Sequence, residues 1–131
     1  MLHQGLKHIP KIYNFIESKT QNCIVMELLG KNLSLHKKLH KNFDTDLAFI
    51  LLHQMLDSIE NLHNKGYIHR DIKPSNFVMD VNNSNQVYMV DFGLAKQHLD
   101  GNGTAIPART NTDFRGTLTY ASVNAHNKLV K

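Results

Sequence analysis

A long amphipathic pattern constrains this chain more than any other feature. Within residues 46–65, apolar side chains recur at three- and four-residue spacing, which places them on one face of an α-helix. Asp44 or Thr45 can cap the start of this helix, and Gly66 can adopt the left-handed conformation that ends one. The apolar face comprises Leu47, Ile50, Leu51, Met55, Ile59 and Leu62. The chain is therefore expected to fold around one long helix with one buried face.

Two short strands are predicted before that helix. Residues 9–16 and 22–29 are rich in β-branched and aromatic residues, and a polar turn separates them. This pattern predicts two antiparallel strands. Gly30 is expected to end the second strand, and residues 32–41 are expected to form a short polar helix.

Two more strands are predicted after the helix. Residues 67–68 begin a loop, residues 77–79 and 87–90 have strand composition, and the polar residues 82–86 form the turn between them. From Gly93 to Tyr120, glycines and a proline argue against regular structure.

Length and charge limit the classes of protein to consider. The chain has 131 residues, enough for one domain, and a formal net charge of +4. Its densest basic patch, residues 36–41, is too short to indicate nucleic-acid binding. The longest apolar runs are too short to span a membrane. We expect a soluble protein of the cytoplasm, with a nuclear location open and the oligomeric state undetermined.

The single cysteine, Cys23, excludes an internal disulfide and a cysteine zinc cluster. It lies in the apolar run 23–26, so a buried, inert thiol is expected. His36 and His40 have the spacing of a metal-binding pair on a helix, but they lie among lysines and a solvated face is expected instead.

Two motifs carry the chemistry. Residues 69–76 read His-Arg-Asp-Ile-Lys-Pro-Ser-Asn, and residues 91–93, across the predicted hairpin, read Asp-Phe-Gly. The pair resembles the catalytic loop and the metal-binding motif of protein kinases. A surface ion pair between Arg70 and Asp71, or a turn residue at Asp91, would account for either motif alone but not for both in register.

The residue types suit phosphoryl transfer, which requires positioned reactants and neutralised charge. Asp71 would be the base that accepts or orients a hydroxyl proton, and Lys73 would place a cation beside the transferred phosphate. Asn76 and Asp91 offer the hard oxygen ligands that Mg²⁺ prefers. Asp71, Lys73 and Asn76 are thus the candidate catalytic residues.

The flanking segments are similar to the casein kinase I group, and residues 114–126 are most similar to its tau-tubulin kinase branch. In that group a Ser-(Ile/Val)-Asn string replaces the usual Ala-Pro-Glu, as at residues 122–124. The resemblance implies an α+β, partial protein-kinase-like fold in a single incomplete domain, residues 1–131. Residues 1–29 would be the last N-lobe strands and the hinge. Residues 30–131 would start the helical C-lobe and include the activation segment.

The resemblance also assigns an ATP site. Met26 would be the gatekeeper of the adenine pocket, the Leu29 backbone would pair with adenine, and Val78 and Val90 would line its floor. Ordinary strand core explains the same residues, and the two readings are compatible because such pockets are mostly apolar. His69 is expected to pack and hold the catalytic loop, and Thr117 to bond Asp71 and Lys73.

Three departures from the family pattern stand out. No Gly-rich loop, strand lysine or partner-helix glutamate precedes His8, and the chain ends at Lys131, before the large C-lobe helices. Thr119 replaces an arginine that helps to hold a phosphate on primed substrates, which leaves Arg70, Lys96 and Arg115 as basic candidates. We expect a fragment truncated at both ends, with a marginal fold and little catalysis alone.

The predicted function is a Ser/Thr protein kinase that uses ATP and Mg²⁺ on a protein substrate. The alternative is a catalytically inactive, kinase-like binding module. An incomplete gene model of an active kinase is the favoured explanation of the missing parts. The substrate is left open.

Overall fold

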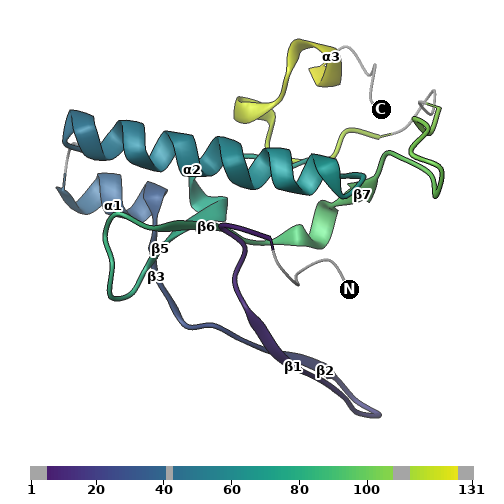
Figure 1. Cartoon of the computed structure of the whole chain (residues 1–131), viewed down its shortest axis with the longest axis horizontal. Helices are drawn as coiled ribbons and strands as arrows, with labels where there is room; N and C mark the ends of the chain where they lie inside the picture. Colours follow the sequence, from purple (N-terminus) through teal and green to yellow (C-terminus); the bar gives the residue numbers. More distant parts are fainter. Residues whose placement is uncertain (1–5, 41–42, 108–112, 127–131) are drawn as a thin grey trace.

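Helix α2 (Thr45–Asn64) is the longest element of the computed structural model, which describes residues 6–40, 43–107 and 113–126 (Figure 1). Asp44 caps it: a carboxylate oxygen of Asp44 accepts the N–H of Leu47 at 3.4 Å, and its carbonyl accepts the N–H of Ala48 at 2.9 Å. Gly66 follows the helix with φ +80°. The sequence prediction for this helix is confirmed to within one residue at each end.

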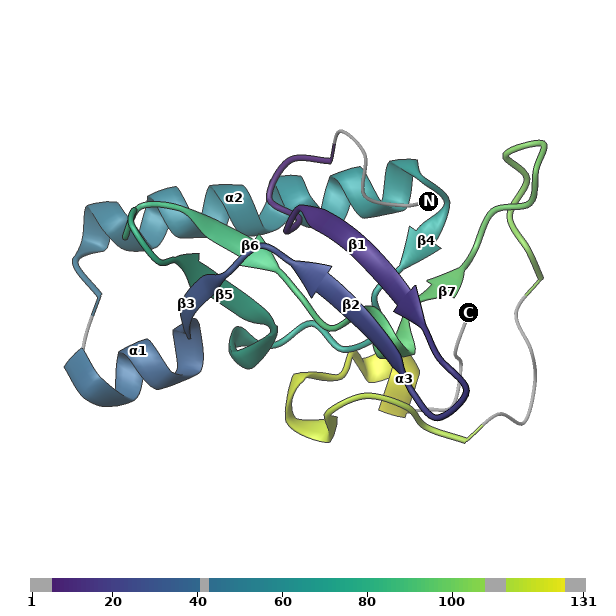
Figure 2. The same cartoon turned by 90° about the horizontal axis from the view of Figure 1, so that it is seen from below.

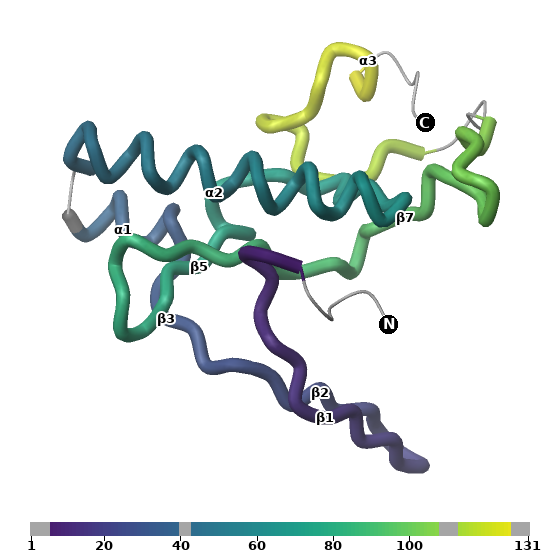
Figure 3. Tube along the Cα trace, viewed as in Figure 1, coloured from purple at the N-terminus to yellow at the C-terminus, as the bar shows by residue number. Residues whose placement is uncertain are grey.

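The N-terminal hairpin consists of β1 (Ile12–Glu17) and β2 (Asn22–Met26), paired antiparallel. Ser18 closes its turn, because its hydroxyl donates to the carbonyl of Gln21 at 2.6 Å. The hairpin extends away from α2, and α3 (Val123–His126) lies on the opposite side of α2 (Figures 1 and 3). The two predicted strands are confirmed, although β1 begins later and ends one residue later than predicted, and β2 ends earlier.

A three-stranded antiparallel sheet packs against α2, in the order β3 (Leu29–Asn32), β5 (Phe77–Asp80), β6 (Val87–Met89). Figure 2 shows these strands beneath the helix. The expectation that Gly30 ends a strand is wrong, because Gly30 lies within β3. A Cβ there would lie 3.2 Å from the Met79 carbonyl oxygen, so the close approach of β5 favours glycine, and a larger residue would push the strands slightly apart.

Shorter elements complete the fold. Asn32 caps α1 (Leu33–His40), since its side chain accepts the N–H of Leu35 at 2.8 Å. The 3₁₀ helices are Pro74–Asn76, Phe92–Leu94 and Leu118–Tyr120. Residues 67–68 were expected to begin a loop, but they form β4 (Tyr67–Ile68), which pairs with β7 (Lys96–Gln97). Because β7 lies about 30 residues after β4, no local sequence pattern predicts that the two strands pair.

The core lies between α2 and the three-stranded sheet. Leu51 and Leu62 of α2 are buried there, and Leu47, Met55 and Ile59 are partly buried against the same cluster. Its other buried members are Leu33, Phe77, Met79, Val87 and Met89. Ile50 was expected on this face, but it is 43% exposed, because the face in contact with the sheet is narrower than the apolar stripe.

Many apolar side chains of the described residues stay exposed. Cys23 in β2 is one position where the prediction fails: its thiol is exposed, not buried. The reason is that, within the described part of the chain, β1 and β2 pair only with each other, and neither strand contains a buried residue. The exposed large apolar residues include Tyr13, Phe15, Ile24, Phe49, Leu52 and Leu56.

Across residues 6–40, 43–107 and 113–126, no helix combines the length and apolar character needed to span a membrane.

Candidate active site

His69 fixes the start of the loop between β4 and β5. Its side chain is 2% exposed, its Nε2 lies 3.0 Å from the Val90 carbonyl oxygen, and its ring lies 5.3 Å from that of Phe92. The N–H of Asp71 donates to His69 Nδ1 at 3.3 Å. A neutral imidazole with its proton on Nε2 satisfies both contacts. The predicted packing role of His69 is confirmed.

Arg70 does not pair with Asp71. It adopts φ +68°, and its Nε donates to the Leu94 carbonyl at 2.6 Å. Burial lowers the pKa of Arg70, and the nearby charge of Arg115 lowers it further. The surface ion pair considered for Arg70 and Asp71 is therefore absent from the described residues, and Arg70 bonds the Leu94 carbonyl instead.

Asp71, Lys73 and Thr117 form a closed set of polar contacts, in which each of the three side chains contacts the other two. Lys73 Nζ lies 2.7 Å from Asp71 Oδ2 and donates to Thr117 Oγ1 at 2.9 Å. Thr117 Oγ1 donates in turn to Asp71 Oδ1 at 2.8 Å. Asp71 is buried and Lys73 is half-buried, so the low local dielectric strengthens these charge-assisted bonds. The expected contacts of Thr117 with both residues are confirmed.

These contacts keep the Asp71 carboxyl ionised. The hydrogen bond from Lys73 is the largest influence and lowers the pKa of Asp71, while burial raises it. The hydrogen bonds from Thr117 and Asn76 and the charge of Lys73 also lower it, so the net shift of the pKa is downward. At neutral pH the group is an acceptor that can orient a hydroxyl proton.

Asn76 lies against the same carboxylate. Its Nδ2 donates to the Asp71 carbonyl at 2.9 Å and to Asp71 Oδ2 at 3.1 Å, while its Oδ1 accepts no hydrogen bond from the described residues. The carbonyl of Asn76 accepts the N–H of Val90 at 2.9 Å, which places the next residue, Asp91, beside this loop. The amide oxygen of Asn76 thus has no hydrogen-bond donor among the described residues.

Asp91 is exposed and adopts φ +64°. Its Oδ1 accepts the N–H of Gly93 at a long 3.4 Å, and its Oδ2 accepts no hydrogen bond from the described residues. A carboxylate oxygen and an amide oxygen that accept no hydrogen bond from the described residues, on adjoining segments, are of the ligand type that Mg²⁺ prefers. The donor set of Asn76 and Asp91 therefore fits this ion.

Gly116 shows a constraint that the sequence patterns do not reveal. It adopts φ +113°, and a Cβ at this position would lie 2.5 Å from the Arg70 carbonyl oxygen. Only glycine allows the segment before Thr117 to approach the loop at residues 69–76 so closely. No local pattern indicates this constraint, because it arises from the meeting of two segments about 45 residues apart in the chain.

The candidate adenine residues come from different sheets. Leu29 in β3 and Val78 in β5 are half-buried and lie on neighbouring strands, and Val90 follows β6. Met26 in β2 is 42% exposed and belongs to the separate hairpin. The structure thus places Leu29 and Val78 in one sheet, Val90 directly after the third strand of that sheet, and Met26 in the segment that leads into it.

No group of three His, Cys, Asp or Glu side chains able to hold a metal ion occurs among the described residues. The solvated face expected for His36 needs correction: the ring is half-buried and stacks on Phe43 with 4.8 Å between centroids. The side chain of His40 lies outside the described residues.

Comparison with known proteins agrees with this geometry. Residues 1–125 match the protein kinase domain. A probable serine/threonine-protein kinase of Dictyostelium discoideum is 47% identical over 109 residues, which cover 80% of this chain and 22% of that protein. The chain therefore spans about a fifth of the length of this relative. The mixture of helices and antiparallel sheets is consistent with part of a protein kinase fold. Because the domain match covers most of its length, the chain belongs to the protein kinase family.

Proposed function

We propose that this protein is a Ser/Thr protein kinase that transfers the γ-phosphate of ATP to a hydroxyl of a protein substrate. The observation that carries the proposal is the closed set of contacts among Asp71, Lys73 and Thr117. It holds an ionised carboxylate and an ammonium group side by side, as positioning of a hydroxyl and a phosphate requires.

In this proposal Asp71 accepts or orients the proton of the substrate hydroxyl. Lys73 holds a positive charge at the phosphate, and its bond to Thr117 fixes where that charge lies. Asn76 Oδ1 and the Asp91 carboxylate would hold Mg²⁺, which supplies neutralisation of the phosphate charge when bound. Met26, Leu29 and Val78, with Val90, would contact the adenine ring.

The finer assignments rest on sequence. Lys73, two residues after Asp71, favours Ser/Thr over Tyr as acceptor, and the name of the Dictyostelium discoideum relative supports this choice. The strings at residues 28–30 and 114–126 favour the casein kinase I group and its tau-tubulin kinase branch.

The test is phosphate transfer by the protein in its natural full-length form, with radiolabelled ATP, Mg²⁺ and casein as acceptor. We expect Mg²⁺-dependent labelling of serine or threonine, abolished by EDTA. Labelling of tyrosine would contradict the Ser/Thr assignment. Binding of ATP without transfer would replace the kinase proposal by a binding module.

A further inference from the structure

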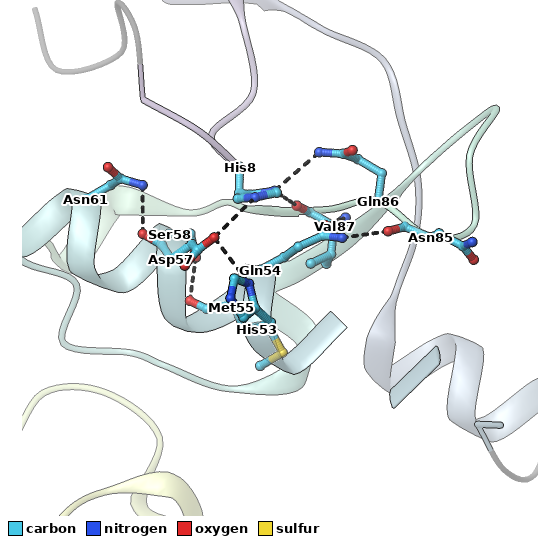
Figure 4. Close-up of polar contacts among 10 residues, drawn as sticks. All are labelled: His8, His53, Gln54, Met55, Asp57, Ser58, Asn61, Asn85, Gln86 and Val87. Carbon is cyan, nitrogen blue, oxygen red and sulfur yellow. Dashed lines mark hydrogen bonds and ion pairs between the residues drawn. The ribbon is translucent and has the colours of Figure 1, made fainter. Parts of the chain in front are cut away.

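A polar network outside the candidate active site joins the segment before β1 to α2 and β6 (Figure 4). His8 lies at its centre, with a side chain that is 13% exposed. His8 Nδ1 is 3.2 Å from the Val87 carbonyl oxygen and 3.2 Å from Gln86 Nε2, and His8 Nε2 is 3.9 Å from Asp57 Oδ2. One imidazole therefore contacts both the helix and the edge of the sheet.

β6 is the outer strand of its sheet, and groups from outside the sheet accept hydrogen bonds from its outward-facing backbone N–H groups. The N–H of Met89 donates to the His8 carbonyl at 2.8 Å, and the N–H of Val87 donates to Gln54 Oε1 at 2.9 Å. The amide of Gln54 also donates to the Asn85 carbonyl at 2.7 Å. Val87 and Met89 are fully buried, so an unpaired N–H at either residue would be costly.

This edge leads directly to the candidate Mg²⁺ ligands. The residue after Met89 is Val90, which donates its N–H to the Asn76 carbonyl at 2.9 Å and contacts His69 Nε2 through its carbonyl at 3.0 Å. Asp91 comes next. A shift of β6 would therefore change the position of Asp91 relative to Asn76.

The backbone of His8 is also unusual, with φ +59°. Residues other than glycine rarely adopt this conformation, although Asn, Asp and His do so more often than most. The ring contacts offset its cost and hold the carbonyl of His8 against Met89.

We propose, resting on the function proposed above, that His8 is a positioning residue: it holds β6, and through it Asp91, in the place relative to Asn76 that Mg²⁺-dependent phosphoryl transfer requires.

Four variants separate the contacts. His8→Gly removes the ring and relieves the backbone. His8→Asn tolerates the same φ and keeps a side-chain N–H that can donate to the Val87 carbonyl, whereas His8→Asp differs by one atom and points a carboxylate at that carbonyl. His53→Ala is the matched control, because His53 Nδ1 contacts Asp57 at 3.3 Å while its side chain is 77% exposed and makes no hydrogen bond to β6 among the described residues.

The first measurement is amide hydrogen exchange of Met89 and Val90 in the full chain without nucleotide. We expect His8→Gly and His8→Asp to accelerate exchange at both amides by about tenfold, with His8→Asn and His53→Ala close to wild type. Equal exchange in all four variants would overturn the structural part of the proposal. If His8→Gly does not fold, the difference in exchange between His8→Asp and His8→Asn decides whether the His8 side chain holds β6.

The second measurement is the Mg²⁺ dependence of phosphate transfer. We expect His8→Asp to raise the half-saturating Mg²⁺ concentration by about tenfold, with an unchanged KM for the protein substrate and recovery in His8→Asn. An unchanged Mg²⁺ dependence would overturn the positioning role. Absence of transfer in the wild type would instead refute the proposed function, and the exchange measurement would still decide whether His8 holds β6.

Discussion

Thr117 lies 46 residues after Asp71 in the chain, and its hydroxyl donates a 2.8 Å hydrogen bond to Oδ1 of Asp71. The same hydroxyl accepts a bond from Lys73, which itself contacts the other carboxylate oxygen of Asp71. A single threonine therefore links the segment around residue 117 to both charged groups of the loop at residues 69–76. The contact orders a pair of charges that the loop alone would hold through flexible side chains.

Replacement of Thr117 tests this link. Thr117→Val removes a hydroxyl that makes two hydrogen bonds to charged groups, so we expect phosphate transfer to fall by about tenfold or more. Thr117→Ser keeps the hydroxyl and should retain most of the rate. The control is Thr119→Val at a nearby exposed position. Equal rates for Thr117→Val and Thr119→Val would show that the link is dispensable.

Gly116 should tolerate no side chain. Gly116→Ala places a Cβ 2.5 Å from the Arg70 carbonyl oxygen and requires a φ near +113°, so we expect destabilisation of more than about 1 kcal/mol. Gly101→Ala is the matched control, because a Cβ there has no atom within 4 Å. Chemical denaturation of both variants measures the difference, and similar unfolding free energies would argue against the observed approach of Gly116 to Arg70.

The lowered pKa of Asp71 predicts a pH dependence of stability. The hydrogen bond from Lys73 is the main cause, opposed by burial, so the folded state holds the ionised form more tightly than the unfolded chain does. A depressed carboxyl pKa contributes stability that is present above the unfolded value of about 4 and is lost as pH falls through the folded value. We expect the free energy of unfolding to fall more steeply below about pH 4 in the wild type than in Asp71→Asn. A constant difference between the two proteins from pH 7 to pH 3 would contradict this assignment.

Asp91 should control the requirement for Mg²⁺. Asp91→Asn removes the negative charge of an exposed carboxylate that makes only one long hydrogen bond among the described residues, so its fold should persist. We expect the half-saturating Mg²⁺ concentration for phosphate transfer to rise by more than about tenfold. Asp46→Asn, on the exposed first turn of α2, is the control for loss of one charge. A shift of the same size in both variants would remove Asp91 from the metal site.

The bounds of α2 were predicted well because the residues that determine them lie within the helix or next to it. The spacing of Leu51, Met55 and Leu62, the Asp44 cap and Gly66 all lie within the helix or next to it. The width of its buried face was less predictable, because the position of the sheet decides which apolar residues are covered. Ile50 has the spacing of the apolar face, yet the sheet does not cover it and its side chain is exposed.

Elements that depend on distant partners were missed. β3 surrounds a glycine that would ordinarily mark a turn, and its pairing with β5 brings together residues 29 and 80. β4 and β7 have two residues each, too few for any periodicity. The exposure of Cys23 was missed for a related reason, since composition predicts burial only where another layer covers the strand.

The candidate site likewise contains residues whose proximity the sequence predicts and residues whose proximity it does not. Asp71, Lys73 and Asn76 belong to one loop, and their proximity follows from the sequence. The contacts of Thr117 were expected from family resemblance alone, while His8, Gln54 and the constraint at Gly116 had no local signal. These positions depend on how separate segments of the chain meet in space.

The most direct test of the central claim compares kcat for phosphate transfer in the wild type and Asp71→Asn, with the protein in its natural full-length form and with Asp46→Asn as the charge control. Loss of a positioned base predicts a fall in kcat of about 10²- to 10⁴-fold, with the KM for ATP little changed and Asp46→Asn at the wild-type rate. A wild-type kcat in Asp71→Asn would contradict the assignment of Asp71 as the group that receives the hydroxyl proton.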